Sequence, residues 1–226
     1  MNIPLGSNIT IKTHEEGQIY ILITGVISLC CLLFSGFSGI SVFFIALTGA
    51  VTSFFRDPDR VLPQDKDVVI SPGDGTIVAI DNTPIPSEVV HHGLNTEYIK
   101  ISIFLSVFNV HVNRIPVSGK IVDAKYHPGK FLNASLDKAS KDNERNTIAI
   151  ETNAGDIIYC TQIAGLIARR IICDAYVGDL YAVGDRYGII KFGSRIDVYL
   201  PKKYKLNVSV GQTMVGGETV IAKIAS

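Results

Sequence analysis

The dipeptide Gly193-Ser194 is the position in this chain with the most distinctive chemical potential. Glycine has no Cβ atom, so the hydroxyl of the following serine can approach the glycine carbonyl closely, in a strained turn that other residues resist. Attack of that hydroxyl on the carbonyl would break the backbone and make Ser194 a reactive centre. Gly-Ser pairs are also common in ordinary turns, so the dipeptide alone leaves both interpretations open.

Two side chains in another segment suit proton transfer and anion binding. His111, in the segment NVHVNR, carries an imidazole that exchanges protons near neutral pH; the alternative is a histidine that completes hydrogen bonds on a strand. Arg114 has planar donors that can hold a phosphate or a carboxylate, and its alternative is a surface ion pair. Both residues are therefore candidates whose roles depend on their context.

Composition limits the classes of function that fit. A chain of 226 residues can bury a sizeable core as one domain, and its formal net charge of zero indicates no nucleic-acid partner. The five histidines are scattered, and the cysteines have no spacing typical of a metal site or a disulfide framework, so we expect no metal. The cysteines are Cys30, Cys31, Cys160 and Cys173.

Residues 17–55 contain no charged side chain and predict a membrane-associated element. Two apolar stretches, 19–34 and 40–55, are separated by SGFSG. A single straight helix would be about 50 Å long, well beyond the ~30 Å hydrocarbon core, whereas each half reaches only ~24 Å. We therefore predict a helical hairpin, which either spans the bilayer or lies in its interface. A hairpin buried in a soluble core is the alternative.

The chain is thus predicted to consist of an N-terminal segment (1–18), the hydrophobic hairpin (19–55) and a catalytic domain (56–226). Residues 1–18 lack a basic region and a small-residue cleavage site, so we expect no removable signal peptide. A hairpin returns both flanks to one side of the membrane. Because basic residues follow it, the positive-inside rule predicts the cytoplasmic side of the inner membrane. These residues are Arg56, Arg60 and Lys66.

The remainder of the chain predicts a mainly β, β-rich α+β domain with an antiparallel barrel or sandwich architecture. Short runs rich in Val, Ile, Tyr and Phe alternate with Pro, Gly, Asn and Asp turns. The runs are VVISP, GTIVAI, YIKISIFLSVFNVHV, GKIVDAKY, NTIAIET, GDIIYCTQI, GIIKF, RIDVYL and TVIAKI. Residues 162–172 are the segment that most favours a helix, although their β-branched residues permit a strand. The C-terminal segment resembles the hairpins of biotinyl and lipoyl carriers, without their carrier lysine, which supports a barrel-sandwich fold and not a carrier function.

Six blocks, in order along the chain, resemble the phosphatidylserine decarboxylase family in its short form. The blocks are FFRDPDR (54–60), SPGDGTI (71–77), FLSVFNVHVNRIPVSGKI (104–121), YHPGKFLNAS (126–135), NERN (143–146) and KFGSRIDVYLP (191–201). The resemblance covers nearly the whole chain, including its hydrophobic N-terminus. It implies a proenzyme that cleaves itself between Gly193 and Ser194, leaving fragments 1–193 (the β chain) and 194–226 (the α chain).

The resemblance also implies the cofactor, the substrate and the partners. Ser194 would become a covalent pyruvoyl group whose ketone condenses with the amine of the phosphatidylserine headgroup and accepts the electrons released with carbon dioxide. The product would be phosphatidylethanolamine, made in phospholipid biosynthesis. The two fragments would remain together as a heterodimer at the membrane, with further homo-oligomerisation left open.

The family pattern does not assign the residue that carries the proton during cleavage as clearly as it assigns the cleavage site. His111 matches a family histidine, and Asp74 in SPGDG matches an aspartate that can orient an imidazole, although a turn aspartate that bonds its own backbone is the alternative. Longer family members have a second histidine three positions after His111, which completes their self-cleavage triad. This chain has Arg114 there, and arginine is not a general base at ordinary pH. Either His111 takes the role, or cleavage depends on strain and water.

Two other functions remain open at this stage. One is decarboxylation of another serine-headgroup lipid, such as an archaetidylserine, because the motifs address the headgroup more clearly than the acyl chains. The other is a membrane-anchored barrel-sandwich interaction module with an uncleaved site. Lipid assays distinguish the first and the covalent state of the chain distinguishes the second.

Overall fold

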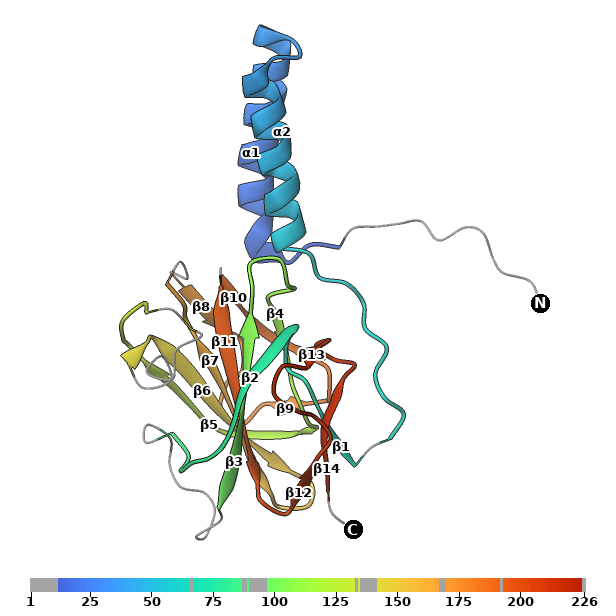
Figure 1. Cartoon of the computed structure of the whole chain (residues 1–226), viewed down its shortest axis with the longest axis vertical. Coiled ribbons are helices and arrows are strands. Elements are labelled where there is room, and N and C mark those ends of the chain that lie inside the picture. Colours follow the sequence, from blue (N-terminus) through green and yellow to red (C-terminus); the bar gives the residue numbers. More distant parts are fainter. Residues whose placement is uncertain are drawn as a thin grey trace, which may run out of the picture. The chain divides into compact units, whose positions relative to one another are not determined.

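The computed structural model describes residues 12–65, 67–86, 89, 97–132, 134, 142–166, 170–191 and 193–224. The chain divides into two compact units, one ending at Asp59 and one beginning at Arg60. In the described residues, the first unit contains two helices and the second contains fourteen strands (Figure 1). The prediction of a mainly β chain with an N-terminal helical hairpin is therefore confirmed.

The first unit is a hairpin of two apolar helices, α1 (Glu15–Ser35) and α2 (Gly39–Phe54). α1 begins before the apolar stretch because the side chain of His14 accepts a hydrogen bond from the N–H of Glu16, which caps the first turn. The chain then reverses after Gly36, whose φ of 61° lies in the left-handed region that favours glycine.

The hairpin exposes large apolar side chains along its length. Leu33 is 72% exposed and Phe34 is 89% exposed, which is unlike the helices of a soluble core. The 21 residues of α1 extend over about 31 Å at 1.5 Å per residue, and α1 is long and apolar enough to cross a membrane. α2 is shorter. These observations favour a membrane-associated hairpin over the buried alternative.

The second unit contains three antiparallel sheets. The largest has the strand order β13-β2-β3-β11-β7-β6-β5-β9, and the smaller ones have the orders β1-β14-β12 and β4-β10-β8. The strands are β1 (Val68–Ile70), β2 (Gly75–Asn82), β3 (Tyr98–Leu105), β4 (Val112–Arg114), β5 (Gly119–His127), β6 (Arg145–Thr152), β7 (Ile157–Ile163), β8 (Arg170–Cys173), β9 (Leu180–Tyr181), β10 (Arg186–Lys191), β11 (Ser194–Pro201), β12 (Tyr204–Leu206), β13 (Thr213–Met214) and β14 (Val220–Ile224).

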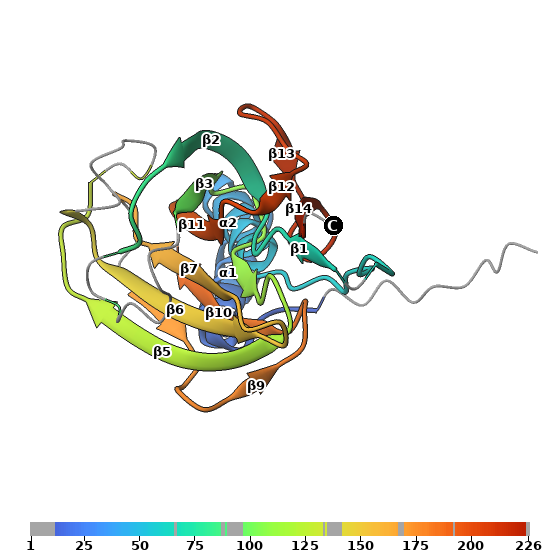
Figure 2. The same ribbon diagram turned by 90° about the horizontal axis from the view of Figure 1, so that it is seen from below.

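The eight-stranded sheet curls into an open half-barrel, as the view in Figure 2 shows. The main hydrophobic core is rich in Ile, Val and Leu side chains; the β-branched ones pack well on a pleated surface. Fully buried members of this core include Ile101, Ile103, Leu105, Ile148, Ile150, Ile196 and Val198. The predicted barrel-sandwich character follows from this curvature and from the hairpin-like pairing of neighbouring strands.

Two predicted elements differ from the structure. The run 98–112 divides after Leu105, because residues 106–109 form a turn before β4. The helical interpretation of residues 162–172 is wrong in the described part: β7 extends to Ile163, and β8 begins at Arg170. Ile163 pairs with Arg195 on β11 and with Arg145 on β6, so β pairing overrides the helical spacing. Residues 167–169 lie outside the described residues.

β11 is a central strand that begins at the predicted scissile serine. It pairs with β3 along its whole length, from Ser194 opposite Leu105 to Pro201 opposite Tyr98. On its other side it pairs with β7, from Arg195 opposite Ile163 onward. Every residue of β11 is buried. The backbone that follows the Gly193-Ser194 bond is therefore fixed from both sides.

The C-terminal strands after β11 also pair with strands from earlier in the chain. β13 pairs with β2, and β14 pairs with β1. Asp156 adds a polar contact, because its carboxylate accepts a hydrogen bond from the hydroxyl of Tyr204 at 3.0 Å and forms an ion pair with Lys203 at 2.6 Å. The segment after residue 193 is thus held by backbone pairing and by side chains that precede the dipeptide.

A buried ion pair lies directly after Ser194. Arg195 and Asp197 are both fully buried and point to the same face of β11, because side chains alternate along a strand. The Nε atom of Arg195 donates to Asp197 at 2.6 Å, and its Nη2 atom donates to the hydroxyl of Ser102 at 2.6 Å. Each charge is therefore compensated inside the sheet.

We predict that Asp197→Ala lowers the free energy of unfolding by about 3–5 kcal/mol, since removal of one partner leaves an uncompensated buried charge. Circular dichroism during denaturation of the full chain in detergent measures this, because the sequence has no tryptophan to report by fluorescence. The control is Glu97→Ala in the exposed pair with Lys202, which should cause no measurable change. Equal effects of the two substitutions would contradict the prediction.

Candidate active site

Ser194 has a fully buried side chain at the first position of β11. Its Oγ atom has no hydrogen-bond partner in the described part of the chain. Such a buried hydroxyl costs about 1–3 kcal/mol compared with one that is satisfied. Native structures rarely tolerate this without a reason, and a reactive role is one such reason. The hydroxyl is therefore a candidate nucleophile.

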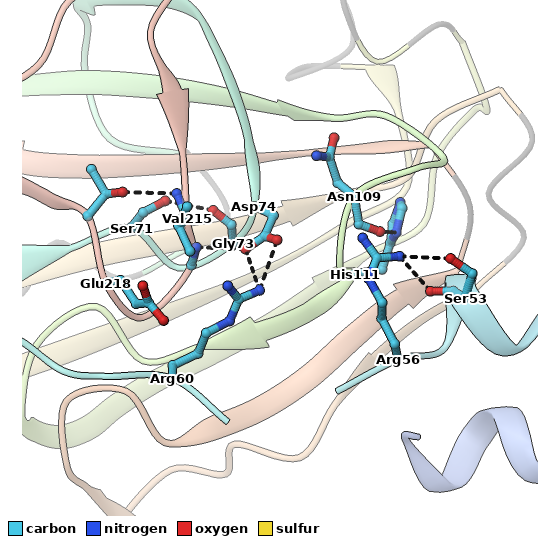
Figure 3. A network of polar contacts seen from close by, with 12 residues as sticks. Ser53, Arg56, Arg60, Ser71, Gly73, Asp74, Asn109, His111, Val215 and Glu218 are labelled. Atoms are coloured by element: carbon cyan, nitrogen blue, oxygen red, sulfur yellow. Dashed lines mark hydrogen bonds and ion pairs between the residues drawn. The ribbon is translucent and has the colours of Figure 1, made fainter. Parts of the chain in front are cut away.

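A hydrogen-bonded turn connects the neighbourhood of Ser194 to His111. Ser106 follows Leu105, the strand partner of Ser194, and the Asn109 side chain accepts hydrogen bonds from the N–H and the Oγ of Ser106 at 2.9 and 2.8 Å. The backbone carbonyl of Asn109 is 3.0 Å from Nδ1 of His111 (Figure 3). The turn therefore fixes the position of the imidazole.

The contact with Asn109 also determines the tautomer of His111. A carbonyl oxygen only accepts, so Nδ1 carries a proton and the neutral ring has its lone pair on Nε2. His111 is fully buried. Its backbone carbonyl accepts a hydrogen bond from the N–H of Ile190 in β10, the strand that leads toward Gly193. Nε2 is therefore the atom through which His111 can act as a base.

Asp74 forms an ion pair with Arg60. The Nη2 atom of Arg60 lies 2.9 Å from each carboxylate oxygen of Asp74, and the N–H of Gly216 donates to Oδ1 at 2.7 Å (Figure 3). Asp74 and Arg60 side chains are 15% and 12% exposed. His111 is not among the hydrogen-bond partners of this carboxylate, so the structure does not bring together the predicted Asp-His pair. A catalytic role for Asp74 stays a prediction.

Arg114 is buried within β4. Its Nη1 atom donates to the backbone carbonyl of Gly184 at 3.0 Å, and its side chain packs closely against Gly217. Its own N–H donates to the carbonyl of Pro72, in the SPGDG segment. These contacts give Arg114 a role in joining three loops, and its proposed binding of substrate stays a prediction.

The buried thiol of Cys160 is a poor competing nucleophile. Burial raises its pKa to about 12, so the thiol is protonated at neutral pH, and its Sγ lies 3.2 Å from the hydroxyl of Tyr187. In the ranges that the structure describes, no group of three or more His, Cys, Asp or Glu side chains could hold a metal ion.

Comparison with known proteins places these residues in a family. A model of the phosphatidylserine decarboxylase family matches residues 47–222. The chain belongs to the phosphatidylserine decarboxylase family. Proteins named phosphatidylserine decarboxylase proenzyme from Rickettsia akari (strain Hartford) and Rickettsia felis (strain ATCC VR-1525 / URRWXCal2) are each 52% identical over 210 residues. The alignments cover 92% of this chain and 89% of each relative.

Two polar contacts within the decarboxylase motifs were not predicted from the sequence. The Ser106 and Asn109 turn has a signal, since asparagine commonly bonds the backbone of a tight turn, yet we singled out only His111 and Arg114 in that block. Arg60 was interpreted only as a membrane-proximal charge. Its contact with Asp74 depends on the tertiary fold, and no local spacing in the decarboxylase sequence indicates it.

We predict that Arg60 and Asp74 are energetically coupled. In a double-mutant cycle of Arg60→Ala and Asp74→Ala, the double variant should be less destabilised than the sum of the single variants, by about 1–2 kcal/mol. Denaturation followed by circular dichroism measures the unfolding free energies. A parallel cycle on the exposed Lys12 and Asp59 pair should be additive. Additive effects at Arg60 and Asp74 would refute the coupling.

Proposed function

We propose that this chain is the proenzyme of a membrane-associated phosphatidylserine decarboxylase, which converts phosphatidylserine to phosphatidylethanolamine and carbon dioxide. Self-cleavage between Gly193 and Ser194 would produce fragments 1–193 and 194–226. The observation that carries the proposal is the buried hydroxyl of Ser194, which has no hydrogen-bond partner among the described residues of a chain whose relatives are named proenzymes.

The proposed cleavage begins with an acyl shift. The Oγ atom of Ser194 attacks the carbonyl carbon of Gly193, and His111 Nε2 takes the hydroxyl proton and returns it to the amide nitrogen as the C–N bond breaks. The product is an ester with a free amine at residue 194. Loss of the α-proton of Ser194 then breaks the Cβ–Oγ bond and releases the Gly193 carboxylate. Water adds at the resulting enamine carbon and ammonia leaves, so that residue 194 becomes a pyruvoyl group.

The residues around position 194 fit such a group. Backbone pairing with β3 and β7 continues from Arg195 onward, and the ion pair of Arg195 with Asp197 holds the strand from inside the sheet. When present, the pyruvoyl group supplies a ketone that takes up the substrate amine and an electron sink for decarboxylation. His111, held by the Asn109 carbonyl, is the proposed proton carrier.

The proposed fragments would stay associated as a heterodimer. Support comes from the pairing of β13 with β2 and of β14 with β1, and from the contacts of Asp156 with Lys203 and Tyr204. Each of these contacts joins residues on opposite sides of the proposed cleavage site. Cleavage of one backbone bond therefore leaves the buried surfaces between the fragments intact.

We infer that the catalytic unit acts on the cytoplasmic side of the inner membrane. The apolar helix α1 supports membrane attachment. The basic residues that follow α2 in the sequence, Arg56, Arg60 and Lys66, support the cytoplasmic side by the positive-inside rule.

Activity measurements on the full chain test the proposed reaction. We predict that the native chain releases carbon dioxide from phosphatidylserine in mixed micelles and forms phosphatidylethanolamine, whereas Ser194→Ala remains a single polypeptide with no activity. Ser209→Ala is the matched control, because Ser209 is an exposed serine in the same fragment and should not alter either result. Activity of an uncleaved chain would contradict the proposal, and turnover of a different serine-headgroup lipid alone would reassign the substrate.

A second prediction concerns the base. His111→Gln should slow self-cleavage by about 10²- to 10⁴-fold, the usual contribution of general acid-base catalysis. The fraction of cleaved chain, followed with time by gel electrophoresis after synthesis, measures this. His127→Gln is the control, since His127 is exposed on β5. A native rate for His111→Gln would instead support cleavage that depends on strain and water.

A further inference from the structure

Gly165 lies against the carbonyl group of the proposed scissile bond. Along β7 and β11, Gln162 pairs with Ile196 and Ile163 pairs with Arg195. The same register, continued beyond the ends of both strands, places Gly165 opposite Gly193. A Cβ atom added to Gly165 would be only 1.9 Å from the carbonyl oxygen of Gly193. No side chain fits at this position unless the carbonyl moves.

We propose that Gly165 is a positioning residue for self-cleavage: its bare α-carbon supports the Gly193 carbonyl in the orientation that the Ser194 hydroxyl attacks. This inference rests on the proposed function. Attack requires the hydroxyl oxygen and the carbonyl carbon to be about 3–3.5 Å apart and aligned, and a misplacement of about 1 Å can cost 10²-fold in rate. A glycine permits the closest approach of a neighbouring backbone.

Asn143 holds the peptide that precedes Gly165. Its fully buried side-chain amide donates to the carbonyl of Ala164 at 2.7 Å and to the carbonyl of Leu132 at 2.8 Å, while its Oδ1 atom accepts from the N–H of Leu132 at 3.0 Å. The N–H of Ala164 donates to the backbone carbonyl of Glu144 at 2.9 Å. The backbone on the N-terminal side of Gly165 is therefore fixed by hydrogen bonds at both its carbonyl and its N–H.

This arrangement resists relaxation around a larger residue. The Gly193 carbonyl precedes a strand that is paired on both sides, and Gly165 follows a peptide that Asn143 fixes. Ala134 also packs nearby, 3.3 Å from the position that a Cβ atom of Gly165 would take. A methyl group at position 165 must therefore displace the scissile carbonyl itself.

Gly119 provides a matched control. A Cβ atom at Gly119 would be 2.2 Å from the carbonyl oxygen of Glu151, a comparable clash with backbone, between β5 and β6. Gly119→Ala and Gly165→Ala should therefore have similar structural costs. Of these two glycines, only Gly165 contacts the proposed scissile bond.

The experiment compares the self-cleavage rates of the native chain, Gly165→Ala and Gly119→Ala, each synthesised as the full chain in detergent. We expect Gly165→Ala to cleave about 10²-fold more slowly than the native chain, while Gly119→Ala cleaves at the native rate per folded molecule. Thermal unfolding of both variants in a Ser194→Ala background reports their stability. Hydroxylamine, which breaks esters and spares amides, should cleave the native precursor and leave Gly165→Ala intact.

A second variant covers the case in which Gly165→Ala does not fold. Asn143→Leu has a similar shape and adds no buried charge, but it loses the two donated hydrogen bonds, and it should slow cleavage and reduce ester trapping in the same direction. Native rates in both folded variants, or equal slowing by Gly119→Ala, would overturn this inference alone. A native chain that never cleaves would overturn the proposed function together with it.

Discussion

β11 is held between β3 and β7 in the middle of the eight-stranded sheet, and the proposed reactive serine begins it. β11 pairs with β3 from Ser194 to Pro201 and with β7 from Arg195 to Tyr199, so most of the strand has backbone partners on both sides. Ser194 is the first residue of β11, and its hydroxyl is buried at the point where the ladder with β7 ends. The sheet therefore holds the backbone after Ser194 in place on both sides, from Arg195 onward.

The polar groups around this strand fall into two sets with different physical roles. The buried pair of Arg195 with Asp197 and the pair of Arg60 with Asp74 neutralise charge inside the second unit, which keeps the sheet and its loops in position. The Ser106 turn and His111 instead place a titratable imidazole with a defined tautomer. Separation of these roles explains how Asp74 can belong to a family motif while its carboxylate accepts hydrogen bonds from Arg60 and from the N–H of Gly216.

Much of the fold was predictable from local patterns, because alternating Val, Ile and Tyr runs between turn residues depend only on neighbours in sequence. The start of β11 was predicted to within one residue in this way, and the hairpin was predicted from two uncharged apolar stretches separated by SGFSG. The contacts of Arg60 with Asp74 and of Gly165 with the Gly193 carbonyl were not, because they arise from strand register and loop packing between distant segments. The segment 162–172 shows the same limit: its helical spacing is real, and sheet pairing of Ile163 overrides it.

Intact-mass measurement of the purified native protein shows whether Ser194 becomes the ketone-bearing end of a new chain. We expect two polypeptides, residues 1–193 with an ordinary carboxyl terminus and residues 194–226 lighter than the serine-terminated peptide by the mass of ammonia. The smaller polypeptide should gain mass on treatment with a hydrazide, which reacts with ketones. A single full-length species, or a small fragment that retains an N-terminal serine, would rule out this conversion.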